Sequence, residues 1–186
     1  MNGSRTEDDT LDLLCDIIVA EAERSGYEVD NIALRDKKIG SCTGCFGCWL
    51  RTPGICVIDD YGRNVAEKVV RSDLLVYLTP VTFGGYSSEL KKALDRMACP
   101  GLLPFLTKKG GEVHHPRRYE TTPTLVALEV LPSRELESEK LFETLVARNA
   151  VNMHTRPHSG IVYSTDTFDV IQKKVDSLLD SAGVGR

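Results

Sequence analysis

Four of the six cysteines in this 186-residue chain lie within one short segment, at Cys42, Cys45, Cys48 and Cys56. In a reducing compartment, clustered thiols are metal ligands or redox groups. Two consecutive CxxC steps bring three thiolates within reach of one site, as in compact iron–sulfur motifs, whereas structural zinc commonly uses two separated CxxC pairs. The spacing leaves three alternatives open: a four-cysteine cluster, reduced thiols, or a zinc or disulfide site.

The other two cysteines, Cys15 and Cys99, fall on apolar faces of expected helices. Free cysteine behaves as a small apolar residue in such positions. We therefore predict that both are core residues and that the chemistry of the thiols is confined to the segment 40–60.

A second candidate segment follows an apolar run and contains Pro80, Val81, Thr82, Phe83 and Gly84. Glycine at this point lets a flat ligand approach the backbone closely, and an aromatic side chain of the segment would cover an aromatic ring. The alternative is an ordinary turn between a strand and a helix.

The start of the chain offers a third candidate, with Ser4, Arg5 and Thr10 placed ahead of an expected helix. Backbone N–H groups and the helix dipole favour an anion such as phosphate there. The carboxylates of residues 7–9 oppose an anion. Serine and threonine before a helix are also common caps, and Thr10 is the expected N-cap.

A fourth segment, His114–Tyr119, contains adjacent histidines and the arginine pair Arg117 and Arg118. Guanidinium groups suit phosphate, so these arginines are candidates for contacting the phosphate of a pyridine nucleotide. The alternative is a solvated polar loop.

These segments lie between alternating helix-like and strand-like patterns. Helices are expected over 11–22, 62–71, from Ser87 or Ser88 to about 97, over 135–150 and from Phe168 onward; strands are expected over 27–35, 73–80, 124–131 and 160–164. The alternation predicts an α/β fold with a parallel sheet between two helical layers. Ligands bind beyond the carboxyl ends of such strands, which directs attention to the loops 2–10, 80–88 and 132–135.

Composition narrows the functional classes. Hydrophobic residues make up 41% and charged residues 27%, values of an ordinary globular protein, and we predict one domain over 1–186 with a cysteine-rich insertion over 40–60. A net charge of −4 opposes nucleic-acid binding through general basicity. Neither a membrane-spanning run nor a signal-peptide pattern is evident, so we expect a cytoplasmic protein without membrane or nucleic-acid partners.

Together the loops resemble those of the flavodoxin-like NAD(P)H-dependent FMN reductases, including the iron–sulfur flavoproteins. The resemblance rests on N-G-S-R at 2–5, C-T-G-C-F-G-C at 42–48, P-G-I-C-V-I-D-D at 53–60 and T-P-V-T-F-G-G-Y-S-S-E-L-K-K-A-L-D-R at 79–96. It implies a three-layer flavodoxin-like sheet with the strand order 2-1-3-4-5.

The resemblance also implies the site. Ser4, Arg5 and Thr10 would hold the FMN phosphate; Pro80, Val81, Thr82, Phe83 and Gly84 would line the ribityl chain and ring; Leu131, Pro132 and Ser133 would cover the other side; and Cys42, Cys45, Cys48 and Cys56 would ligate a 4Fe–4S cluster. NAD(P)H would be the cosubstrate, and the acceptor a small molecule or a protein. The flavin performs the chemistry, so no catalytic side chain is expected. A homo-oligomer is expected.

One departure concerns the first strand, which is central in this order. Only Met1 and Asn2 precede the G-S-R loop, so the strand is missing or truncated. An empty slot exposes unpaired backbone groups, which predicts reduced FMN affinity or a slot covered by another chain. Three functions follow: an FMN-dependent oxidoreductase, a flavin and iron–sulfur electron carrier, or a flavodoxin-fold binding module that has lost FMN.

Overall fold

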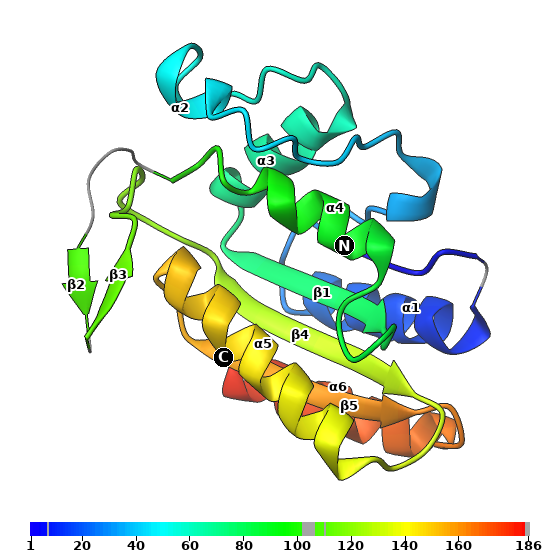
Figure 1. Ribbon diagram of the computed structural model, residues 1–186. Coiled ribbons are helices and arrows are strands. Elements are labelled where there is room, and N and C mark those ends of the chain that lie inside the picture. Colours follow the sequence, from blue (N-terminus) through cyan, green and yellow to red (C-terminus); the bar gives the residue numbers. More distant parts are fainter. Residues whose placement is uncertain (7, 102–106, 110, 185–186) are drawn as a thin grey trace.

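The computed structural model describes residues 1–6, 8–101, 107–109 and 111–184. Its main sheet contains three parallel strands in the order β1 (Leu74–Pro80), β4 (Thr124–Leu131) and β5 (Pro157–Tyr163). Helices cover both faces of the sheet, which confirms the predicted three-layer α/β architecture (Figure 1).

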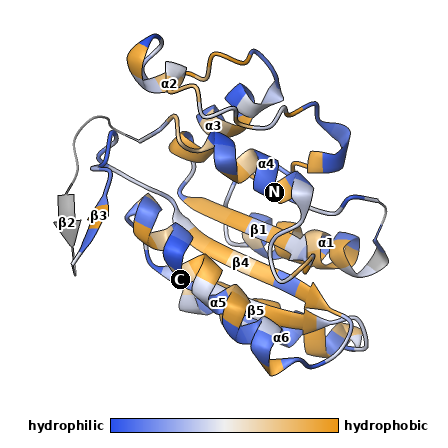
Figure 2. Cartoon of the chain, in the orientation of Figure 1, coloured by the Kyte–Doolittle hydropathy of each residue, from blue (hydrophilic) through white to orange (hydrophobic). Residues whose placement is uncertain are grey.

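The strands form where apolar residues continue without a helical period. Seven of the eight residues of β4 are buried, and its ladder to β1 runs in register from Leu74 opposite Thr124 to Pro80 opposite Val130. Figure 2 shows both strands as apolar along most of their length. A strand that is apolar on both faces requires a covering layer on each side, and the helices supply those layers.

The helices fall into two layers. On one face, α1 (Asp9–Arg24) and α6 (Phe168–Ser181) share an apolar core with the sheet. On the other face, α3 (Tyr61–Arg71), α4 (Ser88–Arg96) and α5 (Leu136–Met153) build a second core. These helices confirm the predicted periodicities, with ends displaced by a few residues.

Side chains fix the starts of three of these helices. Asp8 accepts a hydrogen bond from the Leu11 N–H, Asp60 from the Gly62 N–H and Ser87 from the Leu90 N–H. The predicted cap at Thr10 is wrong, because Thr10 already lies inside α1 and the carboxylate of Asp8 satisfies the exposed N–H group.

The edge of the sheet beside β1 differs from the predicted pattern. Residues 27–35 form no strand; Ala33 makes one parallel bridge to Asn2, and Leu34–Asp36 is a short 3₁₀ helix. Asn2 bridges Leu78 on its other side, so 31–33, Met1–Gly3, β1, β4 and β5 follow the predicted order 2-1-3-4-5. On each side of Met1–Gly3 the described residues form a single isolated bridge, to Ala33 and to Leu78, and not a continuous ladder.

A groove of about 1020 Å³ lies next to Met1, between β1 and residues 27–32. Its walls include Ile18 and Val19 of α1 and the edge of β1 at Leu74 and Val76. That another chain covers the sheet at this position stays a prediction.

Two features of the connecting segments were not predicted. The stretch 100–123 contains a hairpin of β2 (Thr107–Lys109) and β3 (Glu112–His114), and the cysteine segment contains the one-turn helix α2 (Gly47–Leu50). Throughout the described ranges, no helix combines the length and apolar character needed to cross a membrane.

Candidate functional site

The predicted flavin site has three loops: the first loop (2–10), the second loop (80–88) and the third loop (132–135). The first and second loops are joined at the carboxyl edge of the sheet. The Ser87 hydroxyl donates to the carbonyl of Gly3, and the Ser87 N–H donates to the hydroxyl of Thr79 at 3.0 Å. A Cβ atom on Gly3 would lie 2.8 Å from the Ser87 Oγ, so glycine permits this approach. The start of α4 therefore holds both loops in one place.

A cation that the sequence analysis missed, Arg35, contacts the first loop from the 3₁₀ helix Leu34–Asp36. The Arg35 guanidinium donates to the hydroxyl of Ser4, which is buried, and also bonds the Asp12 carboxylate at 3.2 Å. Burial raises the pKa of Asp12, but the hydrogen bonds from Arg35, the Asp8 N–H and Asn2, together with the charge of Arg35, leave that pKa below its usual value. Arg35 is the last residue of the strand predicted over 27–35 and lies in the 3₁₀ helix Leu34–Asp36, and nothing in its local sequence signals this role.

Of the three predicted phosphate residues, Ser4 and Thr10 face the interior more than Arg5 does. Ser4 is buried, Thr10 is half-buried in the first turn of α1, and Arg5 is exposed. Asp8 caps the helix at the same end, so its carboxylate competes with a bound anion, whereas Arg35 favours one. Glu7 lies outside the described residues. Hydroxyl groups, helix N–H groups and a cation suit a phosphate group.

The second loop is a tight hairpin turn. Thr82 and Gly85 exchange two backbone hydrogen bonds, of 2.9 and 3.1 Å, around Phe83 and Gly84. Both turn residues have positive φ, 50° for Phe83 and 71° for Gly84. A positive φ suits Gly84 but is strained for a bulky aromatic residue. The turn presents the Phe83 ring entirely to solvent at the ligand edge.

The remaining predicted flavin residues are only partly accessible. Pro80 and Val81 are half-buried, whereas Leu131 is buried and Pro132 and Ser133 are exposed. Because Leu131 packs into the core, the chain offers a flavin only the exposed part of the third loop.

Tyr86 is directed into the protein and not across the predicted flavin surface. Its ring packs edge-to-face on those of Tyr77 and Phe142, and its hydroxyl accepts a hydrogen bond from Asn149 at 2.9 Å. Burial raises the pKa of Tyr86 to about 12. Of the two aromatic residues considered for covering a ring, Phe83 is therefore the accessible one.

A buried acid lies beside this edge and was not predicted. Glu129 of β4 is opposite Thr79 in the ladder and is fully buried, and neither carboxylate oxygen has a hydrogen-bond partner among the residues that the structure describes. Burial, with further contributions from the charges of Glu139 and Glu143, raises the pKa of Glu129 to about 8. A lone glutamate within an apolar strand was the available signal.

The cysteine segment is held at both ends by a buried ion pair. Arg96, at the end of α4, bonds the Asp60 carboxylate and the carbonyl of Gly40, each at 3.0 Å, and the carbonyl of Ile58. Asp60 also accepts from the Gly40 N–H at 2.7 Å. Burial raises the pKa of Asp60, but hydrogen bonds from Arg96, Gly40 and Gly62 bring it below its usual value.

Between these anchors the four thiols differ in their exposure. Cys42 and Cys45 are exposed and Cys48 and Cys56 are half-buried. Hydrogen bonds from the Gly47 N–H and the Thr43 side chain lower the pKa of Cys45, whereas burial and the charge of Cys56 raise that of Cys48. The described residues contain no group of three metal-ligating side chains close enough to hold a metal ion.

The two predicted core cysteines are both buried. Cys99, however, lies in the turn that follows α4 and not on the helix, and its surroundings include Cys48 and Cys56. Burial, together with those thiols, raises the pKa of Cys99 to about 11. Arg96 lies beside Cys56, and its buried Nε has no hydrogen-bond partner within the described ranges. By composition, the four thiols of the segment 40–60 and the buried Arg96 suit an anionic metal–sulfur group. In the described structure, however, these thiols do not surround one point.

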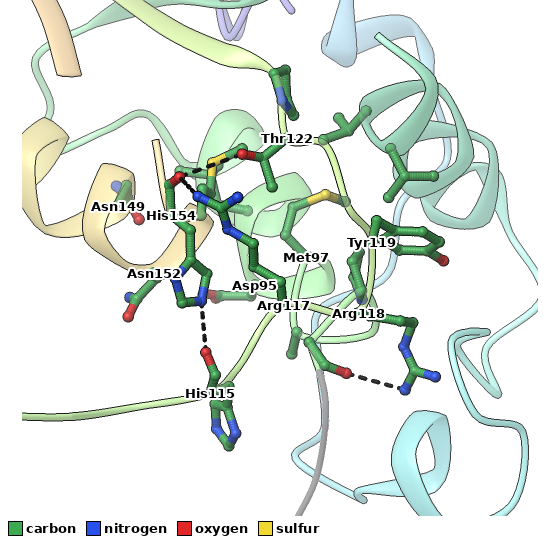
Figure 3. A pocket seen from close by; sticks show the side chains of 18 of the residues that line it. Asp95, Met97, His115, Arg117, Arg118, Tyr119, Thr122, Asn149, Asn152 and His154 are labelled. Atoms are coloured by element: carbon green, nitrogen blue, oxygen red, sulfur yellow. Dashed lines mark hydrogen bonds between the residues drawn. The ribbon is translucent and has the colours of Figure 1, made fainter. Parts of the chain in front are cut away.

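The His114–Tyr119 segment lies against a cavity of about 540 Å³ between α4 and α5 (Figure 3). His114 is buried within 3.3 Å of a Glu112 carboxylate oxygen. Arg117 and Arg118 line the cavity together with Trp49 from the cysteine segment. The structure therefore places this segment beside the cysteine loop.

Known structures and sequences agree with this architecture. The azoreductase AzrA superposes with a TM-score of 0.65 at 12% identity, covering 97% of this chain and 94% of that chain. An FMN-dependent NADH-azoreductase from Bacillus anthracis, in complex with FMN, gives a TM-score of 0.58 at 11% identity, covering 98% and 95%. At these identities the likeness establishes the flavodoxin-like fold.

Sequence comparison is more specific. An iron–sulfur flavoprotein from Archaeoglobus fulgidus is 34% identical over 98 residues, which are 53% of this chain and 44% of the relative. This chain thus spans about half the length of the curated relatives it matches. The family described as NADPH-dependent FMN reductase matches residues 1–125, which include the first loop, the cysteine segment and the second loop. On this match over more than half of its 186 residues, the chain belongs to the NADPH-dependent FMN reductase family.

Proposed function

We propose that the protein is an FMN-dependent oxidoreductase that passes electrons from NADH or NADPH through FMN to a small-molecule or protein acceptor. The observation that carries the proposal is the joining of the first and second loops through Ser87 and Gly3, at the carboxyl edge of a sheet from this family. Ligands of parallel α/β sheets bind at this edge.

The residues present divide the binding of FMN between two surfaces. Ser4, Thr10 and Arg35 would hold the phosphate at the start of α1. The hairpin around Phe83 and Gly84 would line the ring, with the Thr82–Gly85 hydrogen bonds keeping its backbone fixed. Bound FMN supplies two-electron and one-electron transfer, so the chain's task is to bind and orient.

We include in this proposal an iron–sulfur cluster held by Cys42, Cys45, Cys48 and Cys56, which would supply one-electron transfer in addition to the flavin. Its support is the composition of the loop, the unsatisfied Nε of Arg96 and the name of the Archaeoglobus relative. Because the thiols are not gathered in the described arrangement, they would have to close around the cluster. Iron and sulfide analysis after anaerobic purification tests this: absence of both from correctly folded protein contradicts it.

FMN binding is tested by titrating the protein and following the quenching of flavin fluorescence. We expect saturable binding of one FMN per chain, weakened about tenfold in Thr10→Val, the cost of about one hydrogen bond to a charged group. Thr6→Val is the matched control, because Thr6 is exposed and contributes only its carbonyl to Arg35. Equal loss in both variants, or no FMN binding by the parent, contradicts the proposed site.

Turnover separates the oxidoreductase from an electron carrier. The FMN-loaded protein is mixed with NADH or NADPH, and nucleotide oxidation is followed at 340 nm with a dye acceptor. Oxidation of either donor supports the oxidoreductase. Full FMN loading with no oxidation of either nucleotide favours the electron carrier, a function that the cysteine segment beside the flavin fold also supports.

A further inference from the structure

We propose that the cavity between α4 and α5 is a binding site for an anionic aromatic small molecule, separate from the predicted flavin surface. Figure 3 shows the guanidinium group of Arg117 beside His154, Asn149 and Asn152, with Arg118 and Tyr119 on the other side. The cavity holds about 540 Å³, within the range of roughly 300–1,000 Å³ typical of small-molecule sites.

The interior of this cavity is apolar and aromatic. Tyr77 and Tyr86 lie at its sheet side, Met97 and Met153 contribute thioethers, and Trp49 adds an indole ring from the cysteine segment. Trp49 is fixed by a 2.8 Å hydrogen bond from its Nε1 to the Ala98 carbonyl. Rings and thioethers of this kind favour a flat aromatic ligand.

The charge at the cavity is positive after its ion pairs are accounted for. Lys91 pairs with Asp95, and Arg148 pairs with Glu112 at 2.7 Å. In the part of the chain that the structure describes, Arg117 and Arg118 bond only backbone carbonyls, those of His154 at 2.7 Å and Gly101 at 3.1 Å.

Arg118 has a further unmet requirement. Its Nε is buried and has no hydrogen-bond partner among the described residues. Arg117 and Arg118 thus border the cavity from different sides, and among the described residues neither has a carboxylate partner and Arg118 keeps an unsatisfied donor. Guanidinium groups in this situation are suited to a ligand anion. Because they border an apolar interior, the anion should be carried by an aromatic body.

The backbone around the arginines is held in place, so the site is largely preformed. The His154 Nε2 donates to the His115 carbonyl at 2.7 Å, and the Thr122 hydroxyl donates to the His154 carbonyl at 3.4 Å. The rings of Trp49 and His115 lie 4.9 Å apart. These contacts tie the segment bearing the arginines to both α5 and the cysteine loop.

The experiment is isothermal titration of the purified holoprotein with 2-naphthalenesulfonate and, separately, with neutral 2-naphthalenesulfonamide. The two probes share ring and size and differ in charge. We expect one sulfonate site per chain, with the sulfonamide bound at least tenfold more weakly, and a loss of that preference in Arg117→Gln/Arg118→Gln. Equal affinity for both probes, or no binding of the sulfonate, overturns the proposal.

Two further variants keep the result specific. Arg24→Gln removes an exposed arginine of α1 far in sequence from the cavity and should leave both affinities unchanged. Val70→Trp, from the α3 side, should fill the cavity and abolish binding of both probes while the circular dichroism spectrum is kept. Unchanged binding in folded Val70→Trp protein places the probe elsewhere and overturns the assignment. FMN loading is measured in the same samples, so failure here is distinguished from failure of the flavin proposal.

Discussion

The two ends of α4 anchor two different loops by two different kinds of contact. At its amino end, the neutral Ser87 joins the first loop to the second through Gly3 and Thr79. At its carboxyl end, Arg96 and Asp60 close the cysteine segment with a buried ion pair. One short helix thus positions both candidate redox elements of the protein.

Each end also carries a buried acid, and the two acids are in opposite situations. Asp60 has a cationic partner and two N–H donors, whereas the carboxylate of Glu129, opposite Thr79 in the sheet, meets no hydrogen-bond partner in the described part of the chain. The comparison shows that the position of the cysteine loop depends on the charged pair of Arg96 and Asp60, whereas the stability of the flavin edge depends on Glu129 staying uncharged. Both dependences can be broken separately.

The largest effect is expected from Arg96→Ala. Removing one partner of a buried ion pair leaves the Asp60 carboxylate uncompensated and costs about 3–5 kcal/mol. That is a large part of the roughly 5–15 kcal/mol by which such domains are stable. Urea unfolding should show a strongly lowered midpoint.

The matched control is Arg71→Ala, which removes an exposed arginine paired with Glu67 on α3. Surface pairs of this kind contribute about 0–1 kcal/mol. If the two variants lose equal stability, the ion pair at the base of the cysteine loop is not the anchor described above.

The second prediction uses pH to separate the two acids. The pKa of Glu129 rises from 4.5 to about 8 on folding, so the folded state binds the proton more tightly. Its contribution to stability is complete below pH 4.5 and is lost as the pH rises through 8, by an amount on the order of a few kcal/mol. Asp60 acts in the opposite direction: its contribution is present above its unfolded pKa and is lost as the pH falls through its lowered folded value.

Glu129→Gln is the test, because the amide keeps the shape and cannot ionise. The free energy of unfolding of the parent should fall between pH 5 and 8.5, and that of the variant should fall less. Parallel pH profiles for the two proteins would show that folding does not raise the pKa of Glu129.

The contrast between the loops also explains what the sequence could predict. The helices, and the buried strands β1 and β4, followed from apolar period and continuity, because both depend on neighbouring residues. The strand expected over 27–35 failed, because strand formation needs a ladder partner and only Asn2 is bridged there. The sequence pattern of residues 27–35 carries no information about the length of the neighbouring segment with which they would pair.

The same distinction holds in the site. Ser87 was predicted as one of two possible caps, since serine before an apolar helix is a local signal. Arg35, Arg96 and Asp60 were missed as anchors, because their contacts join residues 23 to 56 positions apart in the chain. The thiols illustrate a further limit: CxxC spacing predicts proximity in sequence, whereas coordination requires a closed loop geometry.

A smaller effect is expected from Ser87→Ala at the other end of α4. Loss of the N-cap and of the bond to Gly3 should cost about 0.5–2 kcal/mol. Because the two flavin loops are then no longer joined, FMN affinity should fall as well, whereas thiol reactivity of the cysteine segment should not change. Ser88→Ala, one residue later and exposed, is the control. A change in thiol reactivity would mean that the two ends of the helix are coupled.

The smallest effects concern two phenylalanines held in the left-handed region, one in each loop. Phe83 has φ 50° with its ring in solvent, and Phe46 has φ 54° with its ring stacked 5.4 Å from that of Trp49. Asparagine tolerates this conformation, and Asn-Gly suits a turn with two positive φ values. Phe83→Asn should therefore gain about 0.5–1 kcal/mol, the strain of one such residue.

Phe46→Asn should gain less or lose stability, because the same relief is offset by loss of the aromatic contact, worth about 0.5–1.5 kcal/mol. Thermal unfolding of both variants beside the parent measures the difference. If Phe83→Asn also weakens FMN binding, the strained ring is retained for the ligand, since the described residues leave it fully exposed. If it destabilises the protein and leaves FMN affinity unchanged, the exposed ring has a structural role and the flavin edge is not held under strain for binding.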